Sequence, residues 1–222
     1  MVLNYYMNII DTSINIKDSS LNNSVENIPL FEIEPIKYEI SDSLITDIVF
    51  QSVASVKHFK HFEICKRINV FAMGESTQRA LNEIGIDSNI AAIPGSSSLN
   101  ELLGKKLIKR KFAIVKGLDG LDEVHNHVIK YGADAKNIVC YKRKKFFKYK
   151  EVREKFNKAD IVIFSSTFAA QIFFENIYVT DSKISFLCIS KRIEEYINNL
   201  GYEAKTINYY SNDLLNEIKK TI

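Results

Sequence analysis

The sequence is poor in the residues that usually accompany disulfides, metal clusters and nucleotide loops. Its 222 residues include three cysteines, three prolines and eight glycines, and there is no tryptophan. Cys65, Cys140 and Cys188 are far apart, and the last two lie in apolar runs, so we expect free, buried and reduced thiols. Because neither a Walker loop nor a glycine-rich dinucleotide fingerprint occurs, we expect no cofactor.

Long hydrophobic runs and a strong charge of one sign are also missing. No segment approaches the roughly 18 consecutive apolar residues of a membrane span. The first ten residues contain no Lys or Arg, which is unlike a secretory signal. We therefore expect a cytoplasmic protein without a membrane partner. The net charge of +3 is too small to indicate a nucleic-acid partner.

The four histidines do not form a pattern typical of metal ligands. His125 and His127 are two residues apart in a predicted helix, so they point to different sides. His58 and His61 are close enough to meet, but no third ligand stands near them. We expect no metal site.

The sequence does contain an internal repeat. Four landmarks recur at spacings of 114 to 116 residues, which indicates two copies of one βαβα unit. The paired landmarks are Ser52 with Ser166, Gly74 with Ser190, Gly85 with Gly201, and Leu99 with Leu214. Gly85, Gly201 and also Gly132 stand where a helix would end in a left-handed residue.

Apolar runs and helical periodicity predict the class of fold. The runs at 47–52, 70–74, 160–166 and 186–190 are continuously apolar, which is typical of parallel strands covered on both faces. Their alternation with helices favours an open, doubly wound α/β fold. The apolar faces predicted for three of the helices comprise Ala80, Leu81 and Ile84; Leu121, Val124, Val128 and Ile129; and Ile193, Tyr196, Ile197 and Leu200.

The two copies are arranged so that one interrupts the other. The first copy continues through strands at 112–117 and 138–141, whereas the second ends with the chain. The unclaimed strands are 8–11 and 28–33, and little helical pattern lies in 14–27. The sequence therefore predicts a discontinuous α/β domain of residues 1–35 and 147–222. A second α/β domain, 36–146, is inserted into it through a two-stranded hinge.

This ordered set of motifs resembles the uroporphyrinogen-III synthase family. The motifs are Ile28 to Pro35, Phe50 to Val56, Met73 to Thr77, Val139 to Arg143, and Phe164 to Ser166. The resemblance implies two flavodoxin-like domains with the substrate, hydroxymethylbilane, between them. It implies a monomeric, cofactor-free lyase of porphyrin and heme biosynthesis. Such a lyase forms uroporphyrinogen III by inverting the terminal pyrrole ring and losing water.

Candidate substrate-binding residues follow the predicted strands, because ligands of open α/β sheets gather at the carboxyl ends of strands. They are Gln51, Ser52, Gly74, Glu75, Ser76, Thr77, Lys116, Gly117, Ser165, Ser166 and Lys191. The alternative is that the small polar residues among them are only helix caps. The chain departs from the family pattern at 11–13 and 190–193, so the resemblance supports contacts in the inserted domain better than in the other.

The resemblance also assigns a catalytic role to Tyr141, whose hydroxyl would donate a hydrogen bond to the departing hydroxyl of the bilane. The alternative is a tyrosine that only packs with its hydroxyl at the surface. The basic run Lys142 to Lys145 is interpreted as a solvated hinge or as a patch that attracts a polyacid. Two other functions stay open, a non-enzymatic two-lobed small-molecule-binding module and an inactive member of the family.

Overall fold

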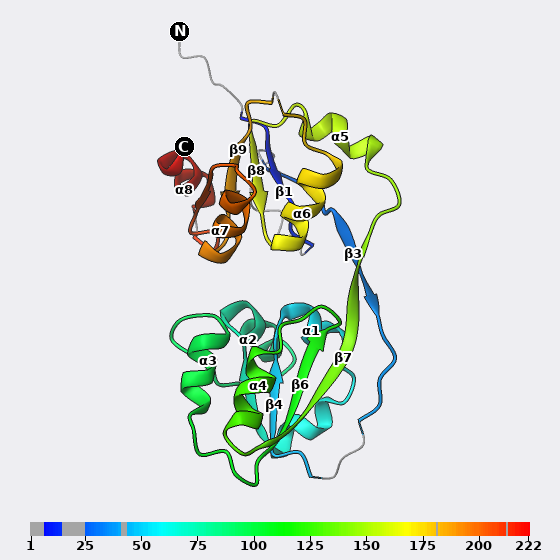
Figure 1. Cartoon of the computed structure of the whole chain (residues 1–222), viewed down its shortest axis with the longest axis vertical. Helices are drawn as coiled ribbons and strands as arrows, with labels where there is room; N and C mark the ends of the chain where they lie inside the picture. The colour runs from blue at the N-terminus through cyan, green and yellow to red at the C-terminus, as the bar shows by residue number, and fades with distance from the viewer. Residues whose placement is uncertain (1–6, 15–24, 41–43, 181, 212) are drawn as a thin grey trace. The chain divides into compact units, whose positions relative to one another are not determined.

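The computed structural model describes residues 7–14, 25–40, 44–180, 182–211 and 213–222. It contains two compact units, Ile33–Lys144 and the combination of Met1–Glu32 with Lys145–Ile222. Figure 1 shows the interruption by colour, because blue strands share a unit with the yellow-to-red end of the chain. The sequence predicts little helix in 14–27, and residues 15–24 of that segment lie outside the described residues. The domain limits expected from the sequence stay a prediction.

The inserted unit, Ile33–Lys144, is built on a sheet in the order β3-β7-β6-β4-β5. The pairs β4–β5, β4–β6 and β6–β7 are parallel. Its elements are β4 (Asp47–Phe50), α1 (Val53–His58), η1 (Phe62–Arg67), β5 (Asn69–Ala72), α2 (Glu75–Asn82), α3 (Ser96–Leu103), β6 (Lys111–Gly117), α4 (Glu123–Lys130) and β7 (Asp134–Lys145).

Both faces of this sheet are covered, as the continuously apolar strands predict. Ile48 and Phe50 of β4 pack into a cluster with Leu81 of α2, while Val49 between them joins a second cluster. That second cluster contains Leu99 from α3 together with Val124 and Val128 from α4. Successive side chains of a strand point to opposite faces, so one strand supplies both cores.

The discontinuous unit has the strand order β10-β9-β8-β1-β2, and all four pairs are parallel. In chain order this is 2-1-3-4-5, the flavodoxin arrangement. The predicted fold class is confirmed. The elements are β1 (Ile9–Asp11), β2 (Val25–Asn27), α5 (Lys150–Phe156), β8 (Ile161–Phe164), α6 (Thr167–Asn176), β9 (Ser185–Cys188), α7 (Lys191–Asn199), β10 (Ala204–Thr206) and α8 (Leu214–Thr221). β3 (Phe31–Pro35) leads out of this unit and belongs to the sheet of the inserted unit.

The repeat is confirmed at the level of individual positions. Ser52 and Ser166 are the N-caps of α1 and α6, and each accepts a hydrogen bond from a first-turn amide. Gly85 and Gly201 both have positive φ, as predicted for the ends of α2 and α7. The spacing of 116 residues even relates two strand pairs. The isolated bridge between residues 71 and 89 corresponds to the pairing of 187 with 205 in β9 and β10.

Some local predictions are wrong. The expected strand 28–33 begins only at Phe31, the first residue of β3, and residues 28–30, which include Pro29, are in no strand. Proline cannot donate a backbone hydrogen bond to a sheet. The expected apolar helix faces are narrower than predicted, since these helices have only eight or nine residues and bury two or so side chains each. The exposed members are Ile84, Leu121, Ile129 and Leu200.

The three cysteines are free and buried, as expected. Burial raises the pKa of Cys65 and Cys140 to about 11 and that of Cys188 to about 12. Within the described part of the chain, no helix is long and apolar enough to cross a membrane.

Candidate functional site

Three neighbouring strands of the inserted unit, β4, β5 and β6, end at one edge of its sheet, beside Tyr141 of β7. Backbone hydrogen bonds tie these ends together, from Met73 to the carbonyl of Phe50, from Gln51 to that of Val115, and from Leu118 to that of Tyr141. This edge gathers most of the residues that the sequence indicated. They are Gln51, Ser52, Gly74, Glu75, Ser76, Thr77, Lys116, Gly117 and Tyr141.

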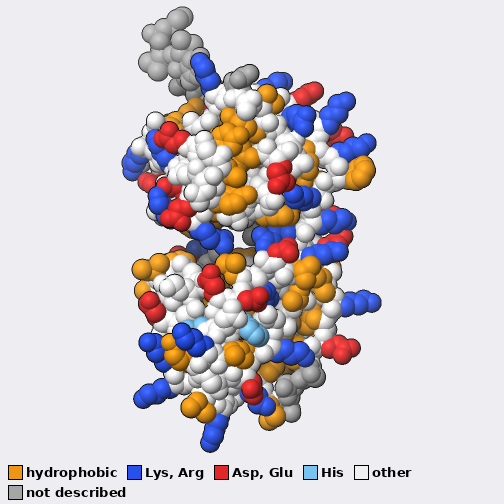
Figure 2. Space-filling model, in the orientation of Figure 1, with side chains coloured by type: hydrophobic (Ala, Val, Ile, Leu, Met, Phe, Trp, Pro, Cys, Tyr) orange, Lys and Arg blue, Asp and Glu red, His pale blue; other side chains and the backbone are white. Residues whose placement is uncertain are grey.

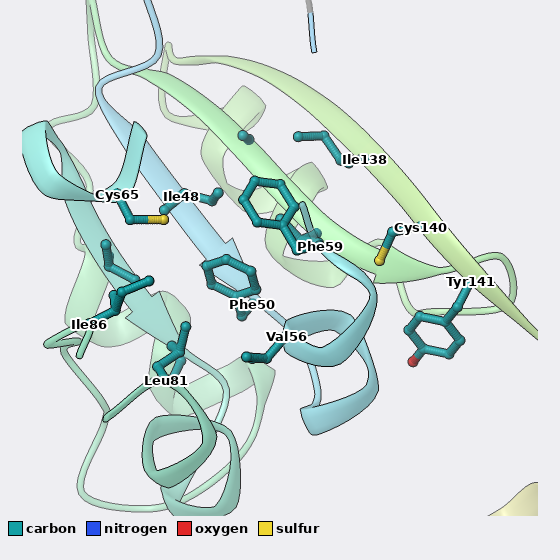
Figure 3. Close-up of a cluster of buried hydrophobic side chains, with 14 residues drawn as sticks. Ile48, Phe50, Val56, Phe59, Cys65, Leu81, Ile86, Ile138, Cys140 and Tyr141 are labelled. Carbon is teal, nitrogen blue, oxygen red and sulfur yellow. The ribbon is translucent and has the colours of Figure 1, made fainter. Parts of the chain in front are cut away.

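Tyr141 lies at the boundary of the core beneath this edge. Its side chain is only 8% exposed, and in Figure 3 its ring lies beside the cluster that holds Phe50, Phe59 and Cys140. The hydroxyl is 2.9 Å from the hydroxyl of Ser52. Burial raises the pKa of Tyr141, and the hydrogen bond with Ser52 opposes this rise. The phenol is therefore protonated throughout the neutral range and is able to donate.

Gly117 makes room for that ring. Its partner across β6 and β7 is Tyr141, at a register shift between Lys116 and Gly117. A Cβ on Gly117 would lie 2.6 Å from two ring carbons of Tyr141. The requirement for glycine here is one of space. The Tyr141 ring therefore packs directly against the backbone of Gly117.

Ser52 fastens the tyrosine to the start of α1. Its hydroxyl accepts the backbone N–H of Ser55 at 3.0 Å, and the Ser55 hydroxyl accepts the N–H of Ser52 at 3.0 Å. This reciprocal capping box fixes the first turn. Capping and contact with Tyr141 are thus made by the same side chain.

Gln51 and Lys116 are occupied with the loop that follows β6. The Gln51 amide donates to the carbonyl of Leu121 at 3.0 Å. Lys116, only 3% exposed, pairs with Asp122 at 2.6 Å and approaches the Leu121 carbonyl at 3.4 Å. The hydrogen bond with Lys116 lowers the pKa of Asp122. Both side chains therefore hold residues 117–122 against the sheet edge.

The first turn of α2 presents backbone amides at the same edge. Gly74 is its N-cap with extended backbone, and the Gly74 carbonyl accepts from Thr77 and Gln78. The amides of Glu75 and Ser76 precede those bonds and have no acceptor within the helix. A carboxylate is a suitable acceptor for such amides. Thr77 itself is buried, so of these side chains Glu75 and Ser76 reach the surface more.

The predicted residues of the discontinuous unit serve its own helices. Ser166 caps α6 by accepting from Ala169 at 3.1 Å, and the Ser165 amide lies 3.4 Å from the Thr12 hydroxyl. Lys191 begins α7, is largely exposed and pairs with Glu194.

Sequence reasoning missed a buried polar cluster at the end of β1. Asp11, 6% exposed, accepts from the Tyr209 hydroxyl at 2.6 Å, from the Ser13 hydroxyl at 3.0 Å and from the Ser13 amide at 2.9 Å. The Asn27 side chain joins it by donating to the Ser13 carbonyl at 2.8 Å. Asp11 ends a short apolar run, and that placement of a carboxylate was the available signal. Its partner 198 residues away could not be predicted from spacing.

The basic run on β7 is largely paired. Lys142 and Lys144 both contact Glu34 of β3, at 2.9 and 2.7 Å, and these bonds lower the pKa of Glu34 to about 2. Lys145 pairs with Glu175 at 2.7 Å. On the face shown in Figure 2, Lys and Arg side chains are interspersed with Asp and Glu. These pairs reduce the field that the run was interpreted to exert on a polyacid.

The histidines lie in separate surroundings. His125 contacts the Asn137 side chain, and His127 contacts the carbonyl of Gly104. The ring of His58 lies 6.0 Å from that of Tyr141. Among the residues that the structure describes, no group of three His, Cys, Asp or Glu side chains is placed to hold a metal ion.

The family model of uroporphyrinogen-III synthase HemD matches residues 21–209. This chain belongs to that family. Among solved structures, it is similar to uroporphyrinogen-III synthetase from Helicobacter pylori, with a TM-score of 0.71 and 14% identity over 96% of this chain and 98% of that one. It is also similar to a mutant uroporphyrinogen III synthase from Thermus thermophilus, with a TM-score of 0.62 and 12% identity over 96% and 98%. At these identities the structures show a shared fold. No curated protein matches.

Proposed function

We propose that the chain is a uroporphyrinogen-III synthase, a lyase that cyclises hydroxymethylbilane with inversion of the terminal pyrrole ring and loss of water. The observation that carries the proposal is the buried, protonated Tyr141 hydroxyl at the strand-end edge of a chain that belongs to this family. This is the group that such a reaction needs, a proton donor beside a site for carboxylates.

Tyr141 is proposed as the catalytic residue. Its proton passes to the hydroxyl oxygen of the substrate, the C–O bond breaks with its electron pair on that oxygen, and water leaves. The remaining cation is stabilised by the electron-rich pyrrole. When the ring closes, the terminal pyrrole loses a proton, which restores the tyrosine, so the net change is the loss of one water.

The first turn of α2 is proposed to hold substrate carboxylates. The amides of Glu75 and Ser76 provide the donors, supported by the positive end of an eight-residue helix. Ser52, Gly117, Gln51 and Lys116 support the tyrosine and the loop beside it rather than supplying free cationic groups. Because a bilane free in solution closes without inversion, the main task of the site is orientation, which supplies roughly 7–11 kcal/mol in the best cases.

The chain is further proposed to act in the cytoplasm as a monomer without a cofactor. Three free, buried thiols with raised pKa fit a reducing compartment. Light scattering coupled to size exclusion checks the monomer, and a mass of two chains would contradict it.

The decisive assay supplies enzymatically made hydroxymethylbilane and separates the porphyrin isomers after oxidation. An excess of the type III isomer over a protein-free control supports the proposal. Type I isomer alone, at the rate of the control, would falsify it and would favour a binding module or an inactive family member. The Tyr141→Phe variant serves as the matched protein control, since it keeps the ring and loses only the hydroxyl.

A further inference from the structure

The hydrogen bonds at the start of α1 assign a direction to the bond between Ser52 and Tyr141. The Ser55 hydroxyl donates to the carbonyl of Ser52 at 2.6 Å, so the Ser55 proton is used there. The Ser52 hydroxyl accepts the amide of Ser55. The proton of the Ser52 hydroxyl is the one proton of this capping box whose acceptor is still to be assigned.

Tyr141 is the acceptor that the structure offers for that proton. A serine hydroxyl has one donor and two acceptor positions. Among the described residues, the Ser52 hydroxyl has two hydrogen-bond partners. One is the backbone amide of Ser55, and the other is the Tyr141 hydroxyl oxygen at 2.9 Å. If Tyr141 donated instead, Ser52 would accept twice and its own proton would have no acceptor among those residues.

We propose that Ser52 is a positioning residue, which donates to the Tyr141 oxygen and so turns the tyrosine's own proton outward, toward the leaving hydroxyl of the substrate. This inference rests on the proposed function. Gly117 supports it, because the ring occupies the space that a Cβ on Gly117 would need, 2.6 Å from two ring carbons, so this neighbour limits movement of the ring and leaves the O–H free to rotate. Donation by Ser52 would also stabilise the negative charge on the Tyr141 oxygen, which exists briefly after proton transfer.

The direction of the bond is measurable without any activity. In protein labelled with 3-fluorotyrosine, fluorine NMR follows the ionisation of each tyrosine, and the Tyr141 signal is the one that disappears in Tyr141→Phe. If Ser52 donates, Ser52→Gly raises the pKa of Tyr141, because the phenolate loses a hydrogen bond. An unchanged or lowered pKa would overturn the proposal, since it would show that Ser52 does not donate to the Tyr141 oxygen.

The other titratable groups that face Tyr141 are the same in Ser52→Gly and in the parent protein. They are Arg143 and Cys140 on its own strand, Asp119 on the loop after β6, and His58 on α1. Their influence cancels in the comparison of Ser52→Gly with the parent protein. Glycine is chosen because it is itself an accepted N-cap and costs little relative to serine.

Kinetics then test the role. Ser52→Gly is expected to lower kcat roughly fivefold to tenfold with little change in KM, the size of one hydrogen bond. Ser52→Thr, which keeps the hydroxyl, should restore most of kcat. Ser55→Ala is the matched control, because it removes the other half of the capping box and leaves the bond to Tyr141.

A double-variant cycle separates positioning from substrate contact. In the Tyr141→Phe background, Ser52→Gly should have no further effect on kcat. If the two losses multiply instead, Ser52 acts independently of Tyr141 and the proposal fails. A parent protein that makes no type III isomer would refute the proposed function and with it the positioning role of Ser52 in catalysis, while the fluorine titration would still report whether Ser52 donates to the Tyr141 oxygen.

Discussion

The two units share one scaffold but carry opposite charges near the end of one corresponding strand. β6 of the inserted unit and β1 of the discontinuous unit occupy the same place beside β4 and β8. The last residue but one of β6 is the buried Lys116, paired with Asp122. β1 ends in the buried Asp11, bonded to Tyr209 and Ser13. The repeat therefore keeps the arrangement of strands and helices without keeping the charge at the ends of these strands.

This difference indicates how the proposed work is divided. A substrate rich in carboxylates is disfavoured beside a buried carboxylate, even one whose acceptors are satisfied, more than beside a lysine that is paired with an aspartate. In the discontinuous unit, the hydroxyl groups of Tyr209 and Ser13 donate to Asp11. In the inserted unit, the Tyr141 hydroxyl is bonded, among the described residues, to Ser52 alone. The inserted unit is thus the better place for the proton donor.

The largest expected effect comes from the same substitution at the two tyrosines. Tyr141→Phe should lower kcat about 100-fold, the lower range for loss of a general acid, while the protein stays folded. Tyr209→Phe should leave kcat within about twofold, because its hydroxyl is bonded to Asp11 in the other unit. Steady-state formation of the type III isomer measures both. Equal losses at the two positions would remove the functional difference between the units.

Gly117→Ala is expected to have the next largest effect. A Cβ 2.6 Å from the Tyr141 ring forces the ring or β7 to move, which should cost about 3 kcal/mol of unfolding free energy and also lower kcat. Urea unfolding and the isomer assay report the two effects. In the double variant Gly117→Ala with Tyr141→Ala, the space is restored and the added cost of the alanine at 117 should largely vanish. Persistence of the full cost would show that the contact with Tyr141 is not its cause.

Tyr209→Phe should cost about 2 kcal/mol, because the Asp11 carboxylate loses a buried donor. Burial and the neighbouring Asp11 raise the pKa of Tyr209. Its contribution is therefore complete below the unfolded tyrosine pKa of about 10 and is lost as the pH rises above it. Urea unfolding from about pH 7 to 11 should show a stability gap between the two proteins that narrows at the alkaline end. A constant gap would argue against the Asp11–Tyr209 bond.

The sequence predicts the repeat, the fold class and the edge of the inserted unit's sheet where the candidate residues lie. Each of these follows from the local pattern of apolar, capping and strand-end residues. Ser52, Ser166, Gly85 and Gly201 occupy their predicted cap positions, since capping depends on the residue and its near neighbours. What the sequence hides is pairing across long separation. Neither the contact of Tyr141 with Gly117 nor that of Asp11 with Tyr209 leaves a periodic signal.

The same limit applies to polar residues at the proposed site. Substrate binding by Lys116 and Gln51 stays a prediction, and their contacts within the protein were not foreseen, because they come from a loop whose path depends on the whole sheet edge. Short edge strands such as β2 and β10, three residues each, likewise owe their existence to a neighbouring strand rather than to apolar content.

The smallest effect tests the likeness of the units instead of their difference. Gly85 and Gly201 both adopt positive φ after equivalent helices, and a Cβ at either would meet no atom within 4 Å. Gly85→Ala and Gly201→Ala should therefore each cost only the strain of a left-handed alanine, about 1 kcal/mol, and the two costs should agree within about 0.5 kcal/mol. Urea unfolding measures both, with kcat unchanged. A clearly larger cost at one position would mean that the helix ends differ in packing, and the equivalence of the two copies would then hold for the strands alone.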